Sequence, residues 1–282
     1  MAIKLPSLEE MLEAGMHFGH KTFRWHPNMA PFIFDERGGI HIIDLSVTQE
    51  YLKKALDFIT RVVSEGGEVL FVGTKRQVAP IIEEVASSIE MPYVVSRWPG
   101  GMLTNFKTVL KSLKRLSKLE ELIQSPYATK KEKRFWKKRK ELLEADFAGI
   151  LRMVELPKVL FVVDLIREKT AVAEARKLGI PIVGVVDTNA NPELVDYPIP
   201  ANDDATGSVS LIVKLIGQAI QEGKKKMKAR AKEQLAGAEE RELPLSDGEL
   251  LEQPEALRAE KEQEKVEGEE ERAKHNIRSK TR

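Results

Sequence analysis

Three short runs of the chain are apolar at nearly every position. They span residues 68–73, 159–164 and 181–187, are rich in Val, Ile, Leu and Phe, and end in Gly or Asp. A strand with one wet face alternates apolar with polar residues, whereas a strand covered on both faces needs no polar positions. These runs therefore predict the central strands of a parallel sheet.

The segments between these runs show helical periodicity or weaker strand signals. Helical patterns lie at 48–64, 75–90, 167–178 and 206–222, and weaker strand candidates lie at 40–44, 92–95 and 197–199. This alternation predicts an α/β fold with a doubly wound, mainly parallel sheet of the Rossmann-like or flavodoxin-like kind. Two helix starts have the spacing of a capping box, at Ser46 with Gln49 and at Thr74 with Gln77. Pro80 lies where the second of these helices should be under way, so we expect it to delay or kink that helix.

Two amphipathic helical patterns interrupt the alternation. The apolar positions of the first recur every three or four residues, at Phe106, Val109, Leu113 and Leu116. The stripe of the second follows a break at 125–127 and consists of Trp136, Leu143, Phe147 and Ile150. Thr129 and Glu132 have capping-box spacing at its start. Residues 105–150 are therefore predicted to form an inserted, protruding α-helical coiled-coil hairpin.

The charge of this insertion is strongly lopsided. Residues 107–140 hold thirteen Lys and Arg against three Glu, a net charge of +10, whereas the whole chain balances to +1. A concentrated positive field attracts polyanions and releases their counterions. The alternative is a solvated helix face, but such a face usually mixes both signs along its length. The pattern favours nucleic acid as a partner.

These patterns divide the chain into three parts. Residues 1–104 and 151–223 are expected to form the α/β domain, with 105–150 inserted into it. Beyond Gly223 the residues are rich in Glu, Lys, Ala and Gln and poor in large apolar side chains. Such a composition cannot bury enough surface to fold independently. We therefore expect 224–282 to be a charged, disordered or loosely helical tail.

The junction at residues 97–108 leads into the basic hairpin. It contains the guanidinium of Arg97, the indole of Trp98, two glycines and a capping amide at Asn105. These groups suit close contact with a phosphate backbone or an unstacked base better than bond-breaking chemistry. The junction therefore indicates RNA recognition.

Three of the five histidines lie close together near the N-terminus, at His17, His20 and His26. Zinc is one interpretation, but a structural zinc site needs four ligands with supporting contacts. The chain has no Cys, and the nearby acids Glu13 and Asp35 have no recognised ligand spacing. We expect no metal here.

The same segment alternates aromatic rings with cations. Phe18, Phe23 and Trp25 are interleaved with Lys21 and Arg24. This pattern suits base stacking and phosphate contact. The alternative is a structural role in which the rings pack over the sheet.

An enzyme or a sensor of a phosphorylated small molecule is the second functional hypothesis. Open α/β sheets bind ligands at the carboxyl ends of their strands, where Gly73, Asp44, Asp164 and Asp187 would lie. However, an Asp after a strand more often caps the next helix or closes a turn. The turn at Gly73 also lacks both the three glycines of a dinucleotide fingerprint and the Gly-Lys-Ser/Thr of a P-loop. No nucleophile with a recognisable base partner is present.

The composition of the chain indicates the cellular environment in which the protein is expected to act. The 282 residues are 42% hydrophobic, which is enough for a sizeable core, and the absence of Cys leaves no disulfide framework. No apolar run approaches the width of a bilayer, and no signal-peptide core is evident. We expect an intracellular, soluble protein without a membrane partner.

Several motifs in fixed order resemble one known family. They are HFGH at 17–20, GIHIIDL at 39–45, FVGTK at 71–75, RWPGGMLTNF at 97–106, DTN at 187–189 and NDDA at 202–205. Together they resemble the bacterial small-subunit ribosomal protein two family, over roughly residues 5–225. The resemblance implies a non-enzymatic, cytoplasmic component of the small ribosomal subunit, with no cofactor. It further implies binding to ribosomal RNA between head and body, contacts with neighbouring ribosomal proteins, and help in recruiting ribosomal protein one for translation.

The expected RNA contacts combine this resemblance with the charge pattern. In the α/β domain they are His17, His20, Lys21, Arg24, Trp25, Lys75, Arg76, Arg97 and Trp98. In the hairpin they are Asn105, Lys107, Lys111, Lys114, Lys118, Lys130, Lys131, Arg134, Lys137 and Lys138.

Overall fold

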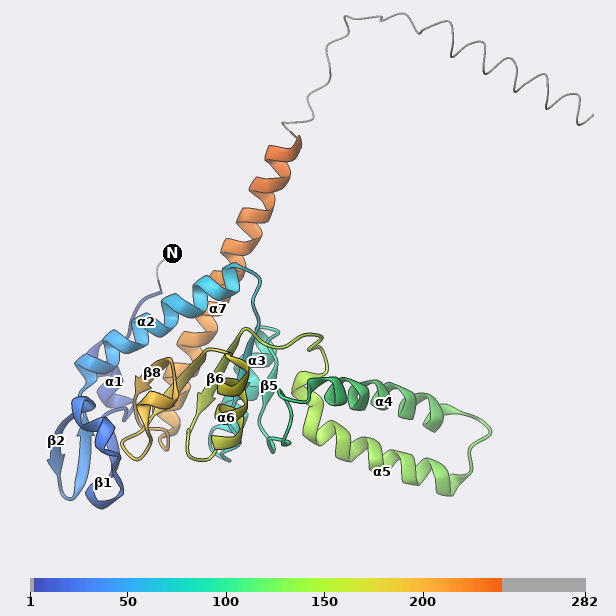
Figure 1. Cartoon of the computed structure of the whole chain (residues 1–282), viewed down its shortest axis with the longest axis horizontal. Helices are drawn as coiled ribbons and strands as arrows, with labels where there is room; N and C mark the ends of the chain where they lie inside the picture. The colour runs from blue at the N-terminus through green and yellow to red at the C-terminus, as the bar shows by residue number, and fades with distance from the viewer. Residues whose placement is uncertain (1–2, 240–282) are drawn as a thin grey trace, which may run out of the picture. The chain divides into compact units, whose positions relative to one another are not determined.

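The structure is a computed structural model that describes residues 3–239 (Figure 1). Residues up to Gln234 form one compact unit, and a second unit begins at Leu235. The first unit contains a five-stranded parallel sheet with the strand order β5-β4-β6-β7-β8. Its strands are β4 (Val69–Val72), β5 (Tyr93–Val94), β6 (Val159–Val163), β7 (Ile182–Val186) and β8 (Tyr197–Pro200). The predicted α/β class with a mainly parallel sheet is confirmed.

The central strands are buried on both faces, as their composition predicts. Every residue of β4, β6 and β7 is buried. Alternate residues enter two different cores, so Phe71 and Phe161 lie in one cluster while Leu70 and Leu160 lie in the other. Each apolar run therefore supplies both cores at once.

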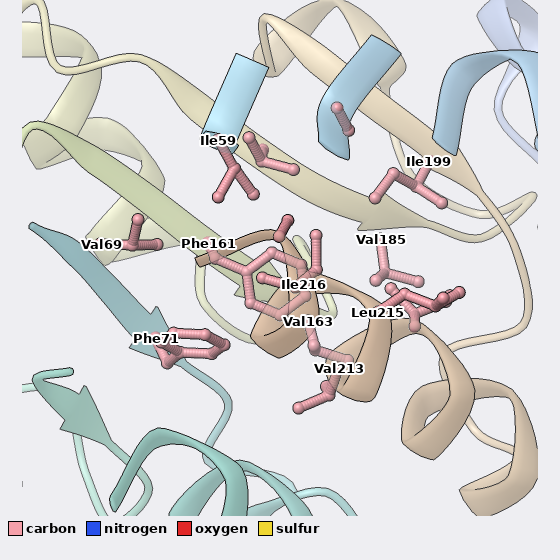
Figure 2. Packing of buried hydrophobic residues seen from close by; sticks show 14 of the residues in the cluster. Ile59, Val69, Phe71, Phe161, Val163, Val185, Ile199, Val213, Leu215 and Ile216 are labelled. Atoms are coloured by element: carbon pink, nitrogen blue, oxygen red, sulfur yellow. The ribbon is translucent and has the colours of Figure 1, made fainter. Parts of the chain in front are cut away.

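The first core lies between the sheet and the helices α2 (Leu45–Ser64), α3 (Ala79–Ser88) and α7 (Thr206–Glu239). Figure 2 shows Ile59 of α2 and Ile216 of α7 around the two central phenylalanines. The rings of Phe71 and Phe161 meet edge to face with 5.3 Å between their centres. The short helix α1 (Leu8–Glu13) buries Met11 in this core.

The second core lies on the other side of the sheet. It contains Ala171, Val172 and Ala175 of α6 (Lys169–Leu178) together with the root of the helical insertion. The doubly wound arrangement is therefore present, with helices on both faces.

A second, smaller sheet was not predicted. It is antiparallel, with the strand order β1-β3-β2, and consists of β1 (Phe18–Lys21), β2 (Ile33–Arg37) and β3 (Ile40–Ile43). The candidate strand at 40–44 therefore exists, but it does not join the parallel sheet. The tight turn at Gly38 and Gly39 pairs it with β2 instead. Short 3-10 turns at Thr22–Arg24 and Pro27–Phe32 connect β1 to β2.

The helix start signals had mixed outcomes. The predicted capping box at Ser46 is wrong, because the cap of α2 is Asp44, whose carboxylate accepts from the amides of Ser46 and Val47. The box at Thr74 is also wrong. Its helix begins only at Ala79, with Pro80 in the first turn, so the expected delay is confirmed.

The insertion forms two helices, α4 (Phe106–Gln124) and α5 (Lys130–Phe147), which lie side by side in Figure 1. The predicted capping box at the start of α5 is confirmed, since Thr129 and Glu132 bond each other reciprocally. A 3-10 turn at Ala148–Ile150 leads back toward β6. The coiled-coil character of the pair stays a prediction.

The last helix is longer than expected. The pattern predicts a helix over 206–222, but α7 continues through Gly223 to Glu239. Gly223 acts as a close-packing position on α2 and does not end the helix. An added Cβ there would lie 2.8 Å from Cβ of Val63 and 2.9 Å from the carbonyl oxygen of Thr60. The part of the predicted tail from 240 to 282 lies outside the described residues.

We predict that Phe161→Ala lowers the free energy of unfolding by about 3–5 kcal/mol, because it opens a cavity at the centre of the first core. Phe34→Ala is the matched control, since the side chain of Phe34 is 69% exposed, and it should change stability by less than about 0.5 kcal/mol. Urea denaturation of the full chain measures both values. Equal effects in the two variants would contradict this assignment of the core.

Candidate nucleic-acid interface

The N-terminal segment is tied to the loop that follows β7. The amide of His20 donates to Oγ1 of Thr188 at 2.8 Å, and the amide of His26 donates to the carbonyl oxygen of Thr188 at the same distance. Nδ2 of Asn28 donates to Oδ1 of Asn191 at 3.1 Å. The segment therefore lies across the carboxyl end of the parallel sheet, held by backbone and amide contacts.

The close fit of this contact depends on Gly19. An added Cβ would lie 2.6 Å from Cγ2 and 2.8 Å from Oγ1 of Thr188, well inside van der Waals contact. Thr188 is fully buried and cannot move outward. Packing therefore requires a glycine at position 19. Without a side chain there, the backbone of the segment can approach Thr188 closely enough to form the hydrogen bonds that hold it.

Aromatic and cationic side chains project from the held segment. Phe23 is 74% exposed and Trp25 is 42% exposed, and Lys21 and Arg24 are also exposed. The guanidinium carbon of Arg24 lies 5.5 Å from the centre of the Phe23 ring. Exposed rings beside cations provide stacking surfaces for bases and partners for phosphates. The structure therefore places Lys21, Arg24 and Trp25 on the surface, and their contact with RNA stays a prediction.

The histidines have mainly internal contacts. The ring of His17 packs against Phe18, with 3.9 Å between ring centres, and burial lowers the pKa of His17. Nδ1 of His20 lies 3.1 Å from Oδ1 of Asp187, and Nε2 lies 3.6 Å from Oδ2 of Asp204. The hydrogen bond to Asp187 raises the pKa of His20 despite its partial burial. Within residues 3–239 no group of three His, Cys, Asp or Glu side chains could hold a metal ion.

Lys75 is enclosed by carboxylates. Its Nζ bonds to Asp204, lies 3.2 Å from Oδ1 of Asp203, and lies 3.8 Å from Oδ2 of Asp164. Burial acts to lower the pKa of Lys75, but its contacts with Asp204 and Asp203 hold the pKa above the ordinary value. The structure therefore uses this predicted RNA contact as an internal counter-ion, while the adjacent Arg76 is exposed.

The carboxyl edge of the sheet is consequently acidic. Burial raises the pKa of Asp203 to about 7, and the charges of Asp187 and Asp164 act in the same direction. Burial likewise raises the pKa of Glu168, which accepts from the amide and hydroxyl of Thr74. Enzymes of this fold class bind phosphates at this edge through backbone amides and glycines. Carboxylates in that position repel a phosphorylated ligand, which disfavours the second functional hypothesis.

The junction before α4 is only partly exposed. Arg97 and Asn105 lie on the surface, whereas Trp98 is 8% exposed and its Nε1 donates to Oε1 of Glu174 at 3.1 Å. Trp98 therefore packs in the second core, and its ring is not presented to a base. Asn105 occupies the N-cap position, but its Oδ1 accepts from the hydroxyl of Thr108 and makes no cap to a backbone amide. The expected capping by its side chain is wrong.

The hairpin separates apolar from cationic side chains. Val109, Leu113, Leu116 and Leu119 are buried along α4. The predicted contacts on the two helices are all exposed: Lys107, Lys111, Lys114, Lys118, Lys130, Lys131, Arg134, Lys137 and Lys138. Among the thirteen hairpin cations, and within the described residues, Lys140 alone has an ion pair, with Glu120 at 2.8 Å and Glu144 at 3.3 Å. Almost all of the positive charge is therefore available to a partner.

The predicted residues thus form several surfaces of different character. The hairpin cations share one pair of helices, and Lys21, Arg24 and Trp25 share the N-terminal segment. Sequence reasoning missed two residues that position these surfaces, Thr188 and Glu174. The DTN motif at 187–189 marks the first of them, whereas a single Glu within a helical pattern gives no signal for the second.

Comparisons with known proteins agree with this architecture. The family described as Ribosomal protein S2 matches residues 11–223. The small ribosomal subunit protein uS2 of Acidothermus cellulolyticus is 51% identical over 221 residues, which cover 77% of this chain and 80% of the relative. That of Mycobacteroides abscessus is 48% identical over 238 residues, covering 83% and 84%, and that of Helicobacter hepaticus is 47% identical over 231 residues, covering 81% and 88%.

Fold and surface together define an α/β protein with a cationic helical insertion and without the fingerprints of a nucleotide-binding enzyme. The chain belongs to the ribosomal protein S2 family. The predicted family is confirmed, and so is the non-enzymatic character, because the relatives are named as proteins of the small ribosomal subunit. Across residues 3–239 the longest apolar helical stretches fall short of what a membrane span requires.

We predict that Gly19→Ala loosens the N-terminal segment, because the new methyl group collides with Thr188. Amides of residues 17–26 should exchange with deuterium faster in the variant than in the wild type. Thr188→Ala removes both colliding atoms, so the double variant should be more stable than the sum of the single effects implies. Simple additivity in urea denaturation would contradict a direct contact between the two residues.

We predict that Asp203 and His20 contribute stability that is lost as pH rises, Asp203 between about 4 and about 7 and His20 above 6.5. The ordinary pKa of an Asp carboxyl is 3.8, whereas burial raises the pKa of Asp203 in the folded protein to about 7. Between these values the folded state keeps a proton that the unfolded state has released, so the stability that Asp203 contributes declines as pH rises toward 7. The raised pKa of His20 has the same sign, because its stabilisation is present below 6.5 and disappears as pH rises through the folded pKa.

Asp203→Asn should therefore flatten the dependence of the unfolding free energy on pH. Asp57→Asn is the control, since Asp57 is exposed on α2, and it should leave the slope unchanged. Urea denaturation at several pH values gives the slopes. A slope that is identical in all three proteins would rule out the contribution of Asp203.

Proposed function

We propose that this protein is a structural component of the small ribosomal subunit that binds ribosomal RNA in the cytoplasm. The observation that carries the proposal is the exposed, almost unpaired positive charge of the hairpin, +10 over residues 107–140. Membership of the ribosomal protein S2 family supports the association with the subunit. The protein acts by binding and shaping, and it performs no chemistry.

RNA binding uses two kinds of contact, one with phosphates and one with bases. Lys and Arg on the hairpin neutralise phosphates and release counterions, which supplies affinity that does not depend on base sequence. Phe23 and Trp25 on the N-terminal segment offer ring faces to unstacked bases, and Lys21 and Arg24 offer charge beside them. Because the two surfaces belong to different elements, they can engage RNA segments that are distant in sequence.

The position between head and body of the subunit, and a role in recruiting ribosomal protein one, belong to the proposal as well. An exposed apolar patch on a protein surface marks a site of interaction with other proteins. One such hollow lies beside the small sheet, where Leu12, Phe18, Phe34, Ile40 and Ile42 gather around it. Leu12, Phe18 and Phe34 are exposed there. We place the contact with neighbouring ribosomal proteins at this hollow.

The central test reverses three charges on α4. Replacing Lys111, Lys114 and Lys118 by Glu should weaken binding to small-subunit ribosomal RNA and reduce incorporation into subunits. If each lysine contacts a phosphate, the slope of log K against log salt should also fall by roughly one per residue. Filter binding at several salt concentrations and sedimentation of particles measure the two effects.

A matched control distinguishes the effect of where the reversed charges lie from the effect of a lower net charge. Lys53, Lys169 and Lys214 are exposed on α2, α6 and α7, so reversing them changes the net charge by the same amount. That variant should bind RNA more tightly than the hairpin variant, with a salt slope closer to the wild type. Normal incorporation of the hairpin variant, or equal loss in both, would refute the proposed role of α4.

A further inference from the structure

Glu174 of α6 receives an unusual number of hydrogen bonds from one short loop. Its Oε1 accepts from Nε1 of Trp98 at 3.1 Å and from the amide of Gly101 at 2.8 Å. Its Oε2 accepts from the amides of Leu103 and Thr104, both at 3.0 Å, and from the hydroxyl of Thr104 at 3.1 Å. Five donors from residues 98–104 therefore converge on a single carboxylate that is only 8% exposed.

This arrangement keeps Glu174 ionised inside the protein. Burial acts to raise its pKa, but the hydrogen bonds from Thr104, Trp98, Gly101 and Leu103 outweigh burial and hold the pKa below its ordinary value. Within the described residues no Lys, Arg or His forms an ion pair with this carboxylate. The negative charge is balanced by the dipoles of the loop itself, as in backbone nests that bind anions.

A buried charge is an expensive way to stabilise a core, because an apolar side chain of similar volume usually serves as well. What a carboxylate adds is geometry, since each of its oxygens fixes several donors in direction and distance. The sheet and both cores are formed by apolar contacts that do not involve Glu174. The hydrogen bonds that its side chain accepts all come from the loop.

The loop in turn connects two parts of the proposed RNA surface. The exposed Arg97 immediately precedes Trp98, and α4 begins at Phe106, one residue after Asn105. On the far side of the loop, Val109 and Leu113 of α4 pack in the same core as Trp98 and Met102. A change in the path of residues 98–104 would therefore move both Arg97 and the root of the hairpin.

We propose that Glu174 is a positioning residue for RNA binding, which fixes the 98–104 loop and through it the placement of Arg97 and of the hairpin. This proposal rests on the proposed function, because it assumes that the hairpin contacts ribosomal RNA. None of the predicted RNA contacts lies on α6. The proposal nevertheless gives α6 a role in RNA binding, because Glu174 of α6 sets the position of residues that contact RNA.

Glu174→Gln in the full chain is the primary test. The amide keeps the size of the side chain but has one acceptor oxygen where the carboxylate has two, and its NH2 group faces backbone donors. We expect affinity for small-subunit ribosomal RNA to fall about tenfold, since hydrogen bonds to a charged group are at stake. Hydroxyl-radical footprints from the hairpin should weaken or shift, while those from residues 21–25 should persist.

Two further variants keep the test decisive. Glu84→Gln, at an exposed position of α3, is the matched control and should behave as the wild type. Glu174→Asp restores the charge with a shorter reach and should recover part of the affinity and of the hairpin footprint. Hydrogen exchange at Gly101, Leu103 and Thr104 reports whether the loop itself has loosened.

The outcomes separate the two proposals. If the wild-type hairpin leaves no footprint on the RNA, the proposed function fails before Glu174 is tested. If the wild type leaves a footprint and Glu174→Gln leaves the same one while loop amides exchange faster, Glu174 only stabilises the loop and the positioning role is overturned. Loss of the hairpin footprint with retention of the N-terminal one supports the positioning role.

Discussion

The structure depends on one constraint, the burial of both faces of the strands β4, β6 and β7. Because every residue of these strands is inside, helices must cover both sides, and the strand ends become the places where polar groups can gather. The loop after β7 begins at this edge and holds the N-terminal segment through Thr188. On the second face, α6 supplies Glu174 to the loop before the hairpin. Both proposed RNA surfaces are thus anchored to the same apolar sheet.

Acidic side chains gather at the carboxyl edge of the parallel sheet, whereas the surplus of basic side chains lies on the helical hairpin. The carboxyl edge of the sheet concentrates Asp164, Asp187, Asp203 and Asp204, and these acids bind Lys75 and His20 internally. In the hairpin, Lys140 is the one cation that has an ion pair with another described residue. The cations of the inserted helices therefore remain open to a polyanion, whereas Lys75 and His20 are held by the acids of the sheet edge. The formal net charge of +1 conceals this separation.

Much of the architecture could be predicted from the sequence because it rests on local patterns. Uninterrupted apolar runs identify β4, β6 and β7, and the Thr129 capping box identifies the start of α5. The small antiparallel sheet escaped prediction because its three strands are short and only partly buried, so they lack a clear period. The helix predicted over 206–222 is too short because its end was set by the change of composition after Gly223, whereas Gly223 itself packs closely against α2, a tertiary contact.

The candidate site was less predictable than the fold because the environment of several of its residues is set by tertiary contacts. Exposed cations on a helix can be read from spacing, and those of the hairpin lie on the surface as expected. Whether Lys75 faces a partner or its own acids, and whether Trp98 stacks or packs, depends on residues more than seventy positions away. The role of Glu174 depends on five donors that only the folded chain brings together.

The insertion also bears on how the chain reaches its native topology. β4 pairs directly with β6, although the 86 residues 73–158, which include α4 and α5, separate them along the chain. Closing so long a loop costs chain entropy before the strand contacts compensate for it. The contacts between α4 and α5 are local in sequence, so a hairpin that formed early would shorten the effective length of chain between the two strands. The insertion that carries the positive charge thus also lies inside the longest chain connection between paired strands of this sheet.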